Sequence, residues 1–512
     1  MRIGVDVGGT NTDAVLMSGT DVLSKTKTAT TPDVSSGIIT AVDEVLQAAS
    51  KQPDIVQGIM IGTTQFTNAV VERKGLSRTA VIRLCLPATT MLPPLVDWPS
   101  DLKDAASFQI YMLPGGHEFD GRPISELDEA NLIRTASQIR DSGVQALAIC
   151  SVFSPVDPSF EEKAAALIRE EIPGIKISLS HEIGRIGLLE RENAAALNAC
   201  LSVTAEKIVI GIGEALAERK LDVPVFWSQN DGTLMDSDFA VRYPVLTVSS
   251  GPTNSMRGAA FLSDIRDGAV VDVGGTTTDV GMLVNGFPRE ASTFVTIGGV
   301  RTNFQMPDVF SFALGGGSLI SQNPFSIGPE SLGYRLNQDG LTFGGTVLTA
   351  TDCAVASGMT SIGDPSFVKD LDSSFTTQVI DEIQRSVSEA VDRMKVSTET
   401  IPVVLVGGGS VLLRKEIEGA SDVIRPEHFE VANAIGAAIA QVGGQVDKVY
   451  SLVDMTRDEA ISQARTEAVQ RSIDAGARAS TVEIVQVDEV PLTYLPSNVT
   501  RIRVKAVGEL AL

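Results

Sequence analysis

The apolar and polar positions divide the chain into alternating strands and helices. Short apolar runs at residues 56–61, 144–152 and 403–406 predict buried strands. Residues 37–49 and 160–171 have the spacing of amphipathic helices. Strands that alternate with helices are typical of a largely parallel sheet covered by helices, so the sequence predicts the α/β fold class.

Three segments depart from this alternation. Residues 90–121 contain clustered prolines and glycines without periodicity, which predicts an inserted loop region. Residues 181–210 begin with charged positions and continue as a long helical run, a natural bridge to the second half. After residue 450 a capped helix at 456–476, flanked by strands near 482–487 and 500–507, predicts a small C-terminal α/β segment.

One polar phrase occurs twice within the apolar pattern. Residues 5–13 read VDVGGTNTD and residues 271–279 read VDVGGTTTD, so the copies differ only at Asn11 and Thr277. In each copy an apolar strand precedes the glycines and another apolar stretch follows, which predicts a β-hairpin with a polar tip. A simple turn does not require agreement at eight of nine positions. The repeat therefore predicts two related domains that face one ligand.

The chemistry of these tips suits a polyphosphate with its metal ion. Adjacent glycines let backbone N–H groups face anionic oxygens, and threonine hydroxyls add donors. Asp6 and Asp272 end the first strand of each hairpin, where a carboxylate can hold Mg²⁺ directly or through water. Neither the P-loop nor the Rossmann glycine pattern is present.

Other glycine-rich loops also follow predicted strands. Residues 407–410 form a Gly-Gly-Gly-Ser run whose backbone can lie flat against a planar ring such as adenine. Residues 62–64 open a helix and are either an anion site or a plain helix cap. The loops at 229–232 and 249–252 lie at strand ends, where α/β proteins place ligands.

Composition narrows the range of partners and compartments. The formal net charge of −23 argues against nucleic acid or anionic membranes as main partners. No signal peptide is expected before the first strand, and no apolar run is expected to reach the roughly 20 residues of a membrane span, so we expect a cytoplasmic protein. Four scattered cysteines, without a C-x-x-C pair, predict buried free thiols.

Together these motifs resemble those of the hydantoinase A/5-oxoprolinase family, within the superfamily of acetate and sugar kinases, heat-shock chaperones and actin. The resemblance rests on both hairpins and on Gly62-Thr63-Thr64, Thr67-Asn68-Ala69, Glu72-Arg73-Lys74-Gly75, Glu190-Arg191, Asn230-Asp231-Gly232, Ser250-Gly251-Pro252, Gly315-Gly316-Gly317-Ser318 and Thr351-Asp352. It implies two actin-like (ribonuclease H-like) domains around an ATP cleft, at residues 1–190 and 191–440, followed by the C-terminal segment 441–512.

The resemblance also implies an activity, cofactors and partners. Members of that group open lactam, hydantoin or related cyclic amide rings with ATP, commonly with a second subunit of the hydantoinase B or unknown-function type. The expected cofactors are ATP and Mg²⁺, and a homo- or hetero-oligomer is expected. A small-molecule kinase of the same superfamily and a regulatory, non-catalytic ATP-binding subunit are the alternatives.

Candidate roles follow for the motif residues. Asp6 and Asp272 are the expected catalytic and metal-binding residues, and Asp13 and Asp279 either support them or only close the hairpins. The expected nucleotide-binding residues are Gly8, Gly9, Thr10, Asn11, Thr12, Gly274, Gly275, Thr276, Thr277, Thr278, Gly407, Gly408, Gly409 and Ser410. His117 lies in a polar loop, where a histidine is more often solvated than catalytic; His181 and His428 are weaker candidates.

Overall fold

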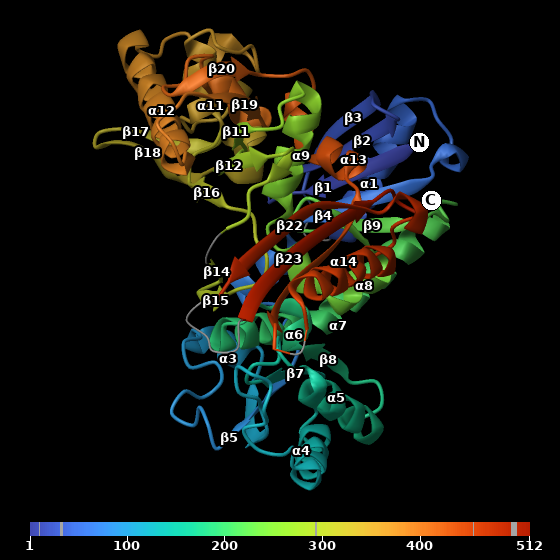
Figure 1. The fold of residues 1–512 in the computed structure, drawn as a ribbon. Helices are drawn as coiled ribbons and strands as arrows, with labels where there is room; N and C mark the ends of the chain where they lie inside the picture. Colours follow the sequence, from blue (N-terminus) through green and yellow to red (C-terminus); the bar gives the residue numbers. More distant parts are fainter. Residues whose placement is uncertain (10, 31–33, 292–293, 454, 493–498, 512) are drawn as a thin grey trace.

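The molecule has three larger β-sheets arranged one after another, with helices packed against them (Figure 1). The computed structural model describes residues 1–9, 11–30, 34–291, 294–453, 455–492 and 499–511. The first sheet lies in the middle of the molecule. The second sheet lies at the upper end of Figure 1 and the third at the lower end.

The first sheet contains the first predicted hairpin. Its strands lie in the order β22 (Glu483–Pro491), β23 (Val499–Gly508), β21 (Val442–Ser451), β10 (Leu234–Asp236), β9 (Val225–Ser228), β4 (Gly58–Thr63), β1 (Arg2–Val7), β2 (Asn11–Ser18) and β3 (Asp21–Ala29). β1 pairs antiparallel with β2 and parallel with β4, so that Asp6 lies opposite Asp13 on one side and Gly62 on the other. Ile3 and Val5 are fully buried, which shows why an apolar strand precedes the tip.

The second sheet repeats this arrangement. Its main path is β13 (Phe287–Pro288), β12 (Thr278–Val284), β11 (Gly268–Val273), β19 (Ile401–Val406) and β20 (Ala420–Ile424), with β16 (Val309–Phe312) paired to β12. β11 pairs antiparallel with β12, where Asp272 lies opposite Asp279, and parallel with β19. The repeated phrase thus marks a repeated hairpin with a parallel strand beside it.

The third sheet is entirely parallel. It consists of β6 (Gln109–Pro114), β5 (Thr79–Leu86), β7 (Ala146–Ser151) and β8 (Lys176–Leu179). The prediction of a loop region at residues 90–121 was wrong in part, because α3 (Ser100–Ala105) and β6 lie within it. β6 is an edge strand with half-buried side chains, so its apolar periodicity is weak.

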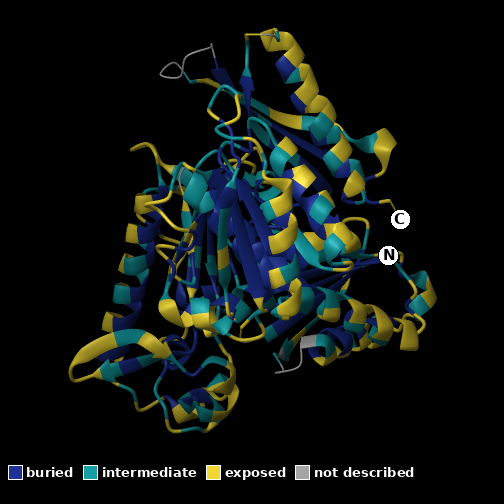
Figure 2. Cartoon of the chain, turned by 90° about the horizontal axis from the view of Figure 1, so that it is seen from below, coloured by how far each residue is buried: buried dark blue, intermediate teal, exposed yellow. Residues whose placement is uncertain are grey.

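Short ribbons and helices complete the fold. Two-stranded ribbons are formed by β14 (Val295–Ile297) with β15 (Val300–Thr302), and by β17 (Ser318–Gln322) with β18 (Phe325–Ser331). The other helices are α1 (Val34–Ala48), α2 (Gln65–Glu72), α4 (Glu129–Asp141), α5 (Ser159–Glu171), α6 (Ser180–Ile183), α7 (Leu188–Glu218), α8 (Ser237–Arg242), α9 (Ser250–Ser263), α10 (Leu336–Asp339), α11 (Ala350–Ala356), α12 (Ser373–Met394), α13 (Ala432–Ile439) and α14 (Arg457–Asp474). Figure 2 shows the central strands buried and many helices exposed along one side.

Two helices, α9 and α13, cross each other so closely that only glycine fits at the contact. A Cβ added to Gly258 would lie 1.8 Å from the carbonyl oxygen of Ala432, and one added to Gly436 would lie 1.9 Å from that of Asn254. α13 approaches β1 equally closely at Gly4, where a Cβ would lie 2.1 Å from the Ala434 oxygen. This crossing fixes the first turn of α13 and the middle of α9 beside the end of β1.

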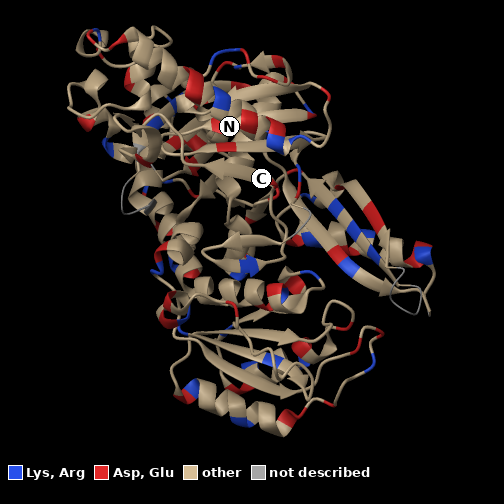
Figure 3. Cartoon of the chain, turned by 90° about the vertical axis from the view of Figure 1, so that its left-hand side faces the viewer, with Lys and Arg blue, Asp and Glu red and all other residues tan. Residues whose placement is uncertain are grey.

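The C-terminal segment extends the first sheet. β21 pairs with β10 at Leu234 and Val442, and β23 and β22 follow outward, while α14 packs on β21 and β23. The predicted capping box is present at Thr456 and Glu459. Figure 3 shows acidic and basic residues interspersed along the chain in that view rather than gathered by sign.

One helix passes the length and hydropathy criteria of a membrane span, contrary to the expectation from the sequence. It is α7, and 56% of its most apolar window is buried inside the protein. Its alanines and leucines from Ala194 to Leu201 belong to an apolar cluster with residues of β5, β7 and α2. A buried core helix passes the same criteria, because it too is apolar on most sides. The four cysteines are buried free thiols, as predicted.

Candidate active site

The two hairpin tips face one shared cavity of about 380 Å³. From the first hairpin it is lined by Asp6, Gly8, Gly9, Asn11 and Asp13, and from the second by Asp272, Gly274, Gly275, Thr276, Thr277 and Asp279. The convergence predicted from the duplicated phrase is therefore present. Volumes of this order are typical of small-molecule sites.

Asp6 is held rigidly at the bottom of its tip. Its side chain is 3% exposed, and its two oxygens accept hydrogen bonds from the amides of Asn254 (2.9 Å) and Asn433 (3.1 Å). Asn433 also donates to Asp13 at 2.8 Å. Gly62 makes room for this carboxylate, because a Cβ there would lie 2.2 Å from Asp6 Oδ1. The crossing of α9 and α13 thus brings both amides to Asp6.

Asp272 occupies the equivalent place in the second hairpin. A Cβ on Gly407, which follows β19 with φ +80°, would lie 2.1 Å from Asp272 Oδ1. The Nζ atom of Lys27, on β3, lies 2.6 Å from Asp13 Oδ1. The positive charge of Lys27 also opposes the rise in the pKa of Asp272. In both sheets, the aspartate near the end of the first hairpin strand therefore lies beside a glycine at the end of the neighbouring parallel strand, Gly62 for Asp6 and Gly407 for Asp272.

Burial makes these carboxyls hard to ionise without a cation. Burial raises the pKa of Asp6 to about 6, with further increases from Asp13 and Asp272 and opposing hydrogen bonds from the two amides. Burial likewise raises the pKa of Asp279 to about 6 and raises that of Asp272. Carboxylates this close to one another and poorly solvated favour a divalent cation between them.

We expect affinity for Mg²⁺ with nucleotide to fall by about tenfold per pH unit below the pKa of the controlling carboxyl. For Asp6 that pKa is about 6. Calorimetric titrations between pH 5 and 8, in buffers of different ionisation enthalpy, should show proton release on binding near pH 6. In Asp6→Asn the release should shrink. If the affinity for Mg²⁺ with nucleotide stayed constant between pH 5 and 8 and no proton were released on binding, Asp6 would not be the controlling carboxyl.

The same shift has the opposite effect on the ligand-free protein. The pKa of Asp6 in the folded chain lies above the ordinary value of 3.8, so protonation of Asp6 favours the folded state. That contribution is complete below the ordinary value and is lost as pH rises through about 6. Weaker ligand binding at pH 5 would therefore not arise from loss of this contribution to folding.

Apolar side chains form part of the cavity wall. Leu336, Phe343 and Ile362 line the cavity together with Asn337 and with the glycines 407–409. A planar base placed between this wall and the glycine backbone would bury its faces in apolar surroundings while Asn337 offers hydrogen bonds. The geometry suits the predicted adenine end of the site.

Most predicted nucleotide-binding residues line the cavity, but three do not. Thr12 and Thr278 are fully buried and absent from the lining, because side chains alternate along a strand and these two face away from the tip. Thr278 instead donates to the Leu314 carbonyl at 2.7 Å. Ser410 is also fully buried behind the glycines, in the short helix 408–412. Thr10 lies outside the described residues.

The three histidines lie apart from the cavity lining. His117 is 3% exposed, against the expectation of a solvated loop residue, and stacks near Phe160 with its Nε2 3.6 Å from Asp157. His181 donates to or accepts from Glu161 at 2.7 Å, and His428 lies beside Lys25. Within the described ranges, no group of three or more His, Cys, Asp or Glu residues forms a ready metal site.

Several lining residues escaped the sequence analysis. Lys27, Asn433, Phe343 and Ile362 belong to no repeated or glycine-rich motif. Lys27 had one available signal, a basic residue at the cross-strand position of Asp13. The other three come from the second half of the chain and are placed by tertiary packing.

Comparison with known proteins agrees with this geometry. The family described as Hydantoinase/oxoprolinase N-terminal region matches residues 2–172, and Hydantoinase/oxoprolinase matches residues 191–365. Caprolactamase subunit alpha of Pseudomonas jessenii is 26% identical over 483 residues, 88% of this chain and 67% of that protein. Acetophenone carboxylase gamma subunit of Aromatoleum aromaticum is 25% identical over 70% of this chain and 53% of that protein.

Solved structures share the fold over the whole chain. The ATP-dependent caprolactamase from Pseudomonas jessenii superposes with a TM-score of 0.78 at 20% identity, covering 100% of this chain and 88% of that one. Nucleotide-free acetone carboxylase superposes with a TM-score of 0.70 at 16% identity, with the same coverage. The predicted fold class, α/β with two actin-like domains, is confirmed.

Proposed function

This chain belongs to the hydantoinase/oxoprolinase family, and we propose that it uses ATP to phosphorylate the carbonyl oxygen of a cyclic amide, the step that leads to ring opening. The observation that carries the proposal is the shared cavity, which is lined by two glycine tips and by Asp6 and Asp272. The family and an ATP-dependent caprolactamase of the same fold support the choice of a lactam or hydantoin ring.

The chemistry answers a specific difficulty of amide hydrolysis. Amide resonance makes the ring carbonyl a poor electrophile. If the carbonyl oxygen attacks the γ-phosphorus of ATP, the P–O bond to ADP breaks, ADP leaves, and the ring carbon is left bearing a phosphate ester. A first water can then add to that carbon, and the C–N bond breaks as the ring nitrogen takes a proton, which leaves an acyl phosphate. A second water attacks the acyl carbon, so that phosphate departs with the former carbonyl oxygen and a carboxylate remains. Phosphoryl transfer requires mainly positioning and charge neutralisation, which this site offers.

We assign the roles within this step to residues of the two tips. The backbone N–H groups around Gly8, Gly9, Gly274 and Gly275 would hold the phosphates. Mg²⁺, when bound, would neutralise charge on the transferring phosphoryl group. Asp6, fixed by Asn254 and Asn433, and Asp272 would hold that ion or its water. Lys27 would balance the charge of Asp13 and the nucleotide.

We further propose that a second subunit completes the reaction. The cavity supplies groups for holding ATP, but no histidine among the described residues lines it to deliver water to an activated carbon. Relatives named as subunits include caprolactamase subunit alpha, acetophenone carboxylase gamma subunit and acetone carboxylase beta subunit. A partner of the hydantoinase B or unknown-function type would supply the water-delivering step.

The carboxylase relatives favour a second candidate. Acetophenone carboxylase gamma subunit matches 70% of this chain, and its substrate class is a ketone rather than an amide. A ketone enolate oxygen can accept a phosphoryl group in the same way. This candidate predicts ATP turnover that responds to ketones and not to rings.

The proposal is tested by ATP turnover against a panel of substrates. We expect lactams, hydantoins or cyclic imides to stimulate phosphate release, ketones to leave it unchanged, and ring opening to appear when the partner subunit is added. Phosphate retained on the ring compound would instead indicate a kinase. ATP turnover unaffected by every ring, with or without the partner, would contradict the proposal.

A further inference from the structure

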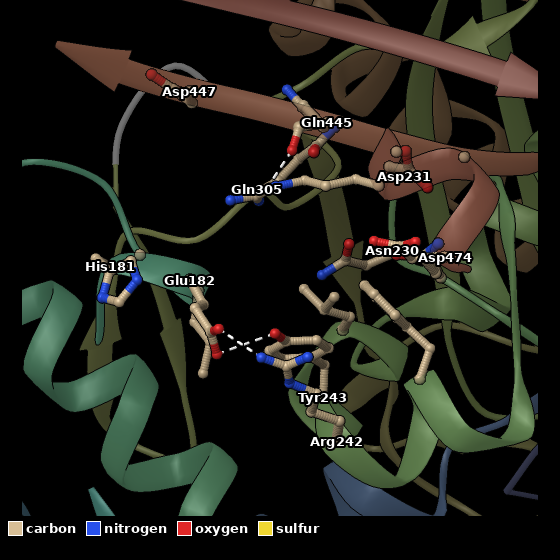
Figure 4. Close-up of a pocket in the computed structure, with 18 of the residues that line it drawn as sticks. His181, Glu182, Asn230, Asp231, Arg242, Tyr243, Gln305, Gln445, Asp447 and Asp474 are labelled. Carbon is tan, nitrogen blue, oxygen red and sulfur yellow. Dashed lines mark hydrogen bonds and ion pairs between the residues drawn. The ribbon is translucent and has the colours of Figure 1, made fainter. Parts of the chain in front are cut away.

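A second cavity, of about 440 Å³, is lined by residues outside the nucleotide cleft (Figure 4). It forms where the first sheet opens: β10 pairs with β21 at Val442, and beyond that point no described strand pairs with this edge of β21. α6, α8 and the loop after β9 surround the opening, and the loop contributes Gln229, Asn230 and Asp231. This loop is one of those predicted from the sequence to lie at a ligand site.

The charged groups deep in this cavity are already paired with one another. Glu182 accepts from Arg242 at 2.5 Å and from the Tyr243 hydroxyl at 3.0 Å, as the dashed lines in Figure 4 show. Arg185 Nε lies 3.0 Å from Asp447. Asp231 lies 2.9 Å from Lys505 outside the lining. Each Lys, Arg or His among the described lining residues has a carboxylate partner, so an anionic ligand would find no free cation there, and the cavity favours a molecule without negative charge.

The group left free is a carboxamide. Asn230 is 2% exposed, and its side chain points from one wall toward Glu182 on the other (Figure 4). Its Nδ2 approaches the Met306 sulfur at 3.3 Å, and its Oδ1 has no hydrogen-bond partner among the described residues. Because Asn230 lines the cavity, this acceptor is available to a donor group of a ligand. Gln305 also lines the cavity, and its Nε2 donates a hydrogen bond to Glu290. No donor among the described residues contacts its Oε1.

A cyclic amide complements a carboxamide in a way that a chain amide does not. A small ring holds its amide cis, so that N–H and C=O point to the same side. The carboxamide of asparagine presents an acceptor and a donor side by side at matching spacing. The two can therefore form a pair of hydrogen bonds at once. We propose that this cavity binds the neutral cyclic amide substrate, with Asn230 as the residue that recognises the ring amide.

The position of Asn230 connects this site to the nucleotide cleft. Its backbone oxygen accepts a hydrogen bond from Thr253 Oγ1 at 3.1 Å. Thr253 belongs to the first turn of α9, whose neighbouring residues Gly251, Pro252 and Ser255 line the nucleotide cleft. Thr253 thus connects the loop that contributes Asn230 to the helix whose first residues line the nucleotide cleft. The inference rests on the proposed function for its choice of a ring amide over other neutral ligands.

The test is calorimetric binding of δ-valerolactam and δ-valerolactone to the full chain without ATP. The two probes have the same ring size, but the lactone lacks the N–H donor. We expect the lactam to bind at least about tenfold more tightly, because a site built around a hydrogen bond discriminates against a ligand that cannot make it. Equal binding of both probes, or no binding of either, would overturn the proposal.

Asn230→Asp provides the matched variant, because it keeps the shape and removes the donor. We expect it to weaken the binding of lactam and lactone alike by about tenfold, because both ring carbonyls lose their donor, while the preference for the lactam remains because the carboxylate still accepts its N–H. Asn285→Asp, in an exposed turn, should change neither. Unchanged lactam affinity in a folded Asn230→Asp variant would contradict the assignment of Asn230 as the residue that recognises the ring amide. If that variant does not fold, the comparison of lactam and lactone on the unmodified chain tests the assignment instead. Titration with Mg-ATP distinguishes failure of this inference from failure of the proposed function. If the ring compound binds but the nucleotide does not, only the proposed function is refuted. If ring compounds stimulate ATP turnover but lactam binding does not depend on Asn230, only this inference is refuted.

Discussion

Asp272→Asn should reduce ATP turnover by about a hundredfold or more while leaving the fold intact. The substitution preserves shape beside Gly407, where there is no room for a larger group. It removes the negative charge that we assign to Mg²⁺ or its water. Because burial raises the pKa of Asp272, the charge is costly in the folded state, and a neutral amide should not lower the melting temperature.

The measurement pairs steady-state phosphate release with thermal unfolding of the same preparations. Asp422→Asn is the matched control, because Asp422 lies in the same sheet, on β20, with an exposed side chain. It should retain full turnover. Normal turnover in Asp272→Asn, with an unchanged melting curve, would remove Asp272 from the site.

The duplicated phrase allowed much of this architecture to be predicted. The two copies of the phrase match at eight of nine positions, and each combines strand periodicity with a glycine tip. The match therefore predicts the same hairpin at two distant points of the chain. The hairpins β1–β2 and β11–β12, their aspartates and the shared cavity follow from it. The parallel strands were also predicted, because buried strands read as continuous apolar runs.

Other parts of the site are set by tertiary packing, which local periodicity does not encode. Asn433 reaches Asp6 because α13 crosses α9 at Gly258 and Gly436, a contact between helices far apart in sequence. Phe343 and Ile362 come from irregular segments, where no period identifies a buried side. Thr12 and Thr278 were predicted from their hydroxyl chemistry, whereas the alternation of side chains along a strand turns these two side chains into the core and away from the cavity.

The second large effect concerns the fate of one oxygen atom and tests the central claim that ATP acts on the ring carbonyl. A lactam labelled with ¹⁸O at the carbonyl would be opened in unlabelled water, by the preparation of this chain and its partner that supports turnover. Phosphorylation of the carbonyl requires that each turnover move the label onto phosphorus. Mass spectrometry of the released phosphate should therefore find one ¹⁸O per ring opened, and the product carboxylate should contain oxygen from water in its place. Unlabelled phosphate, with the ¹⁸O retained in the carboxylate, would contradict the account.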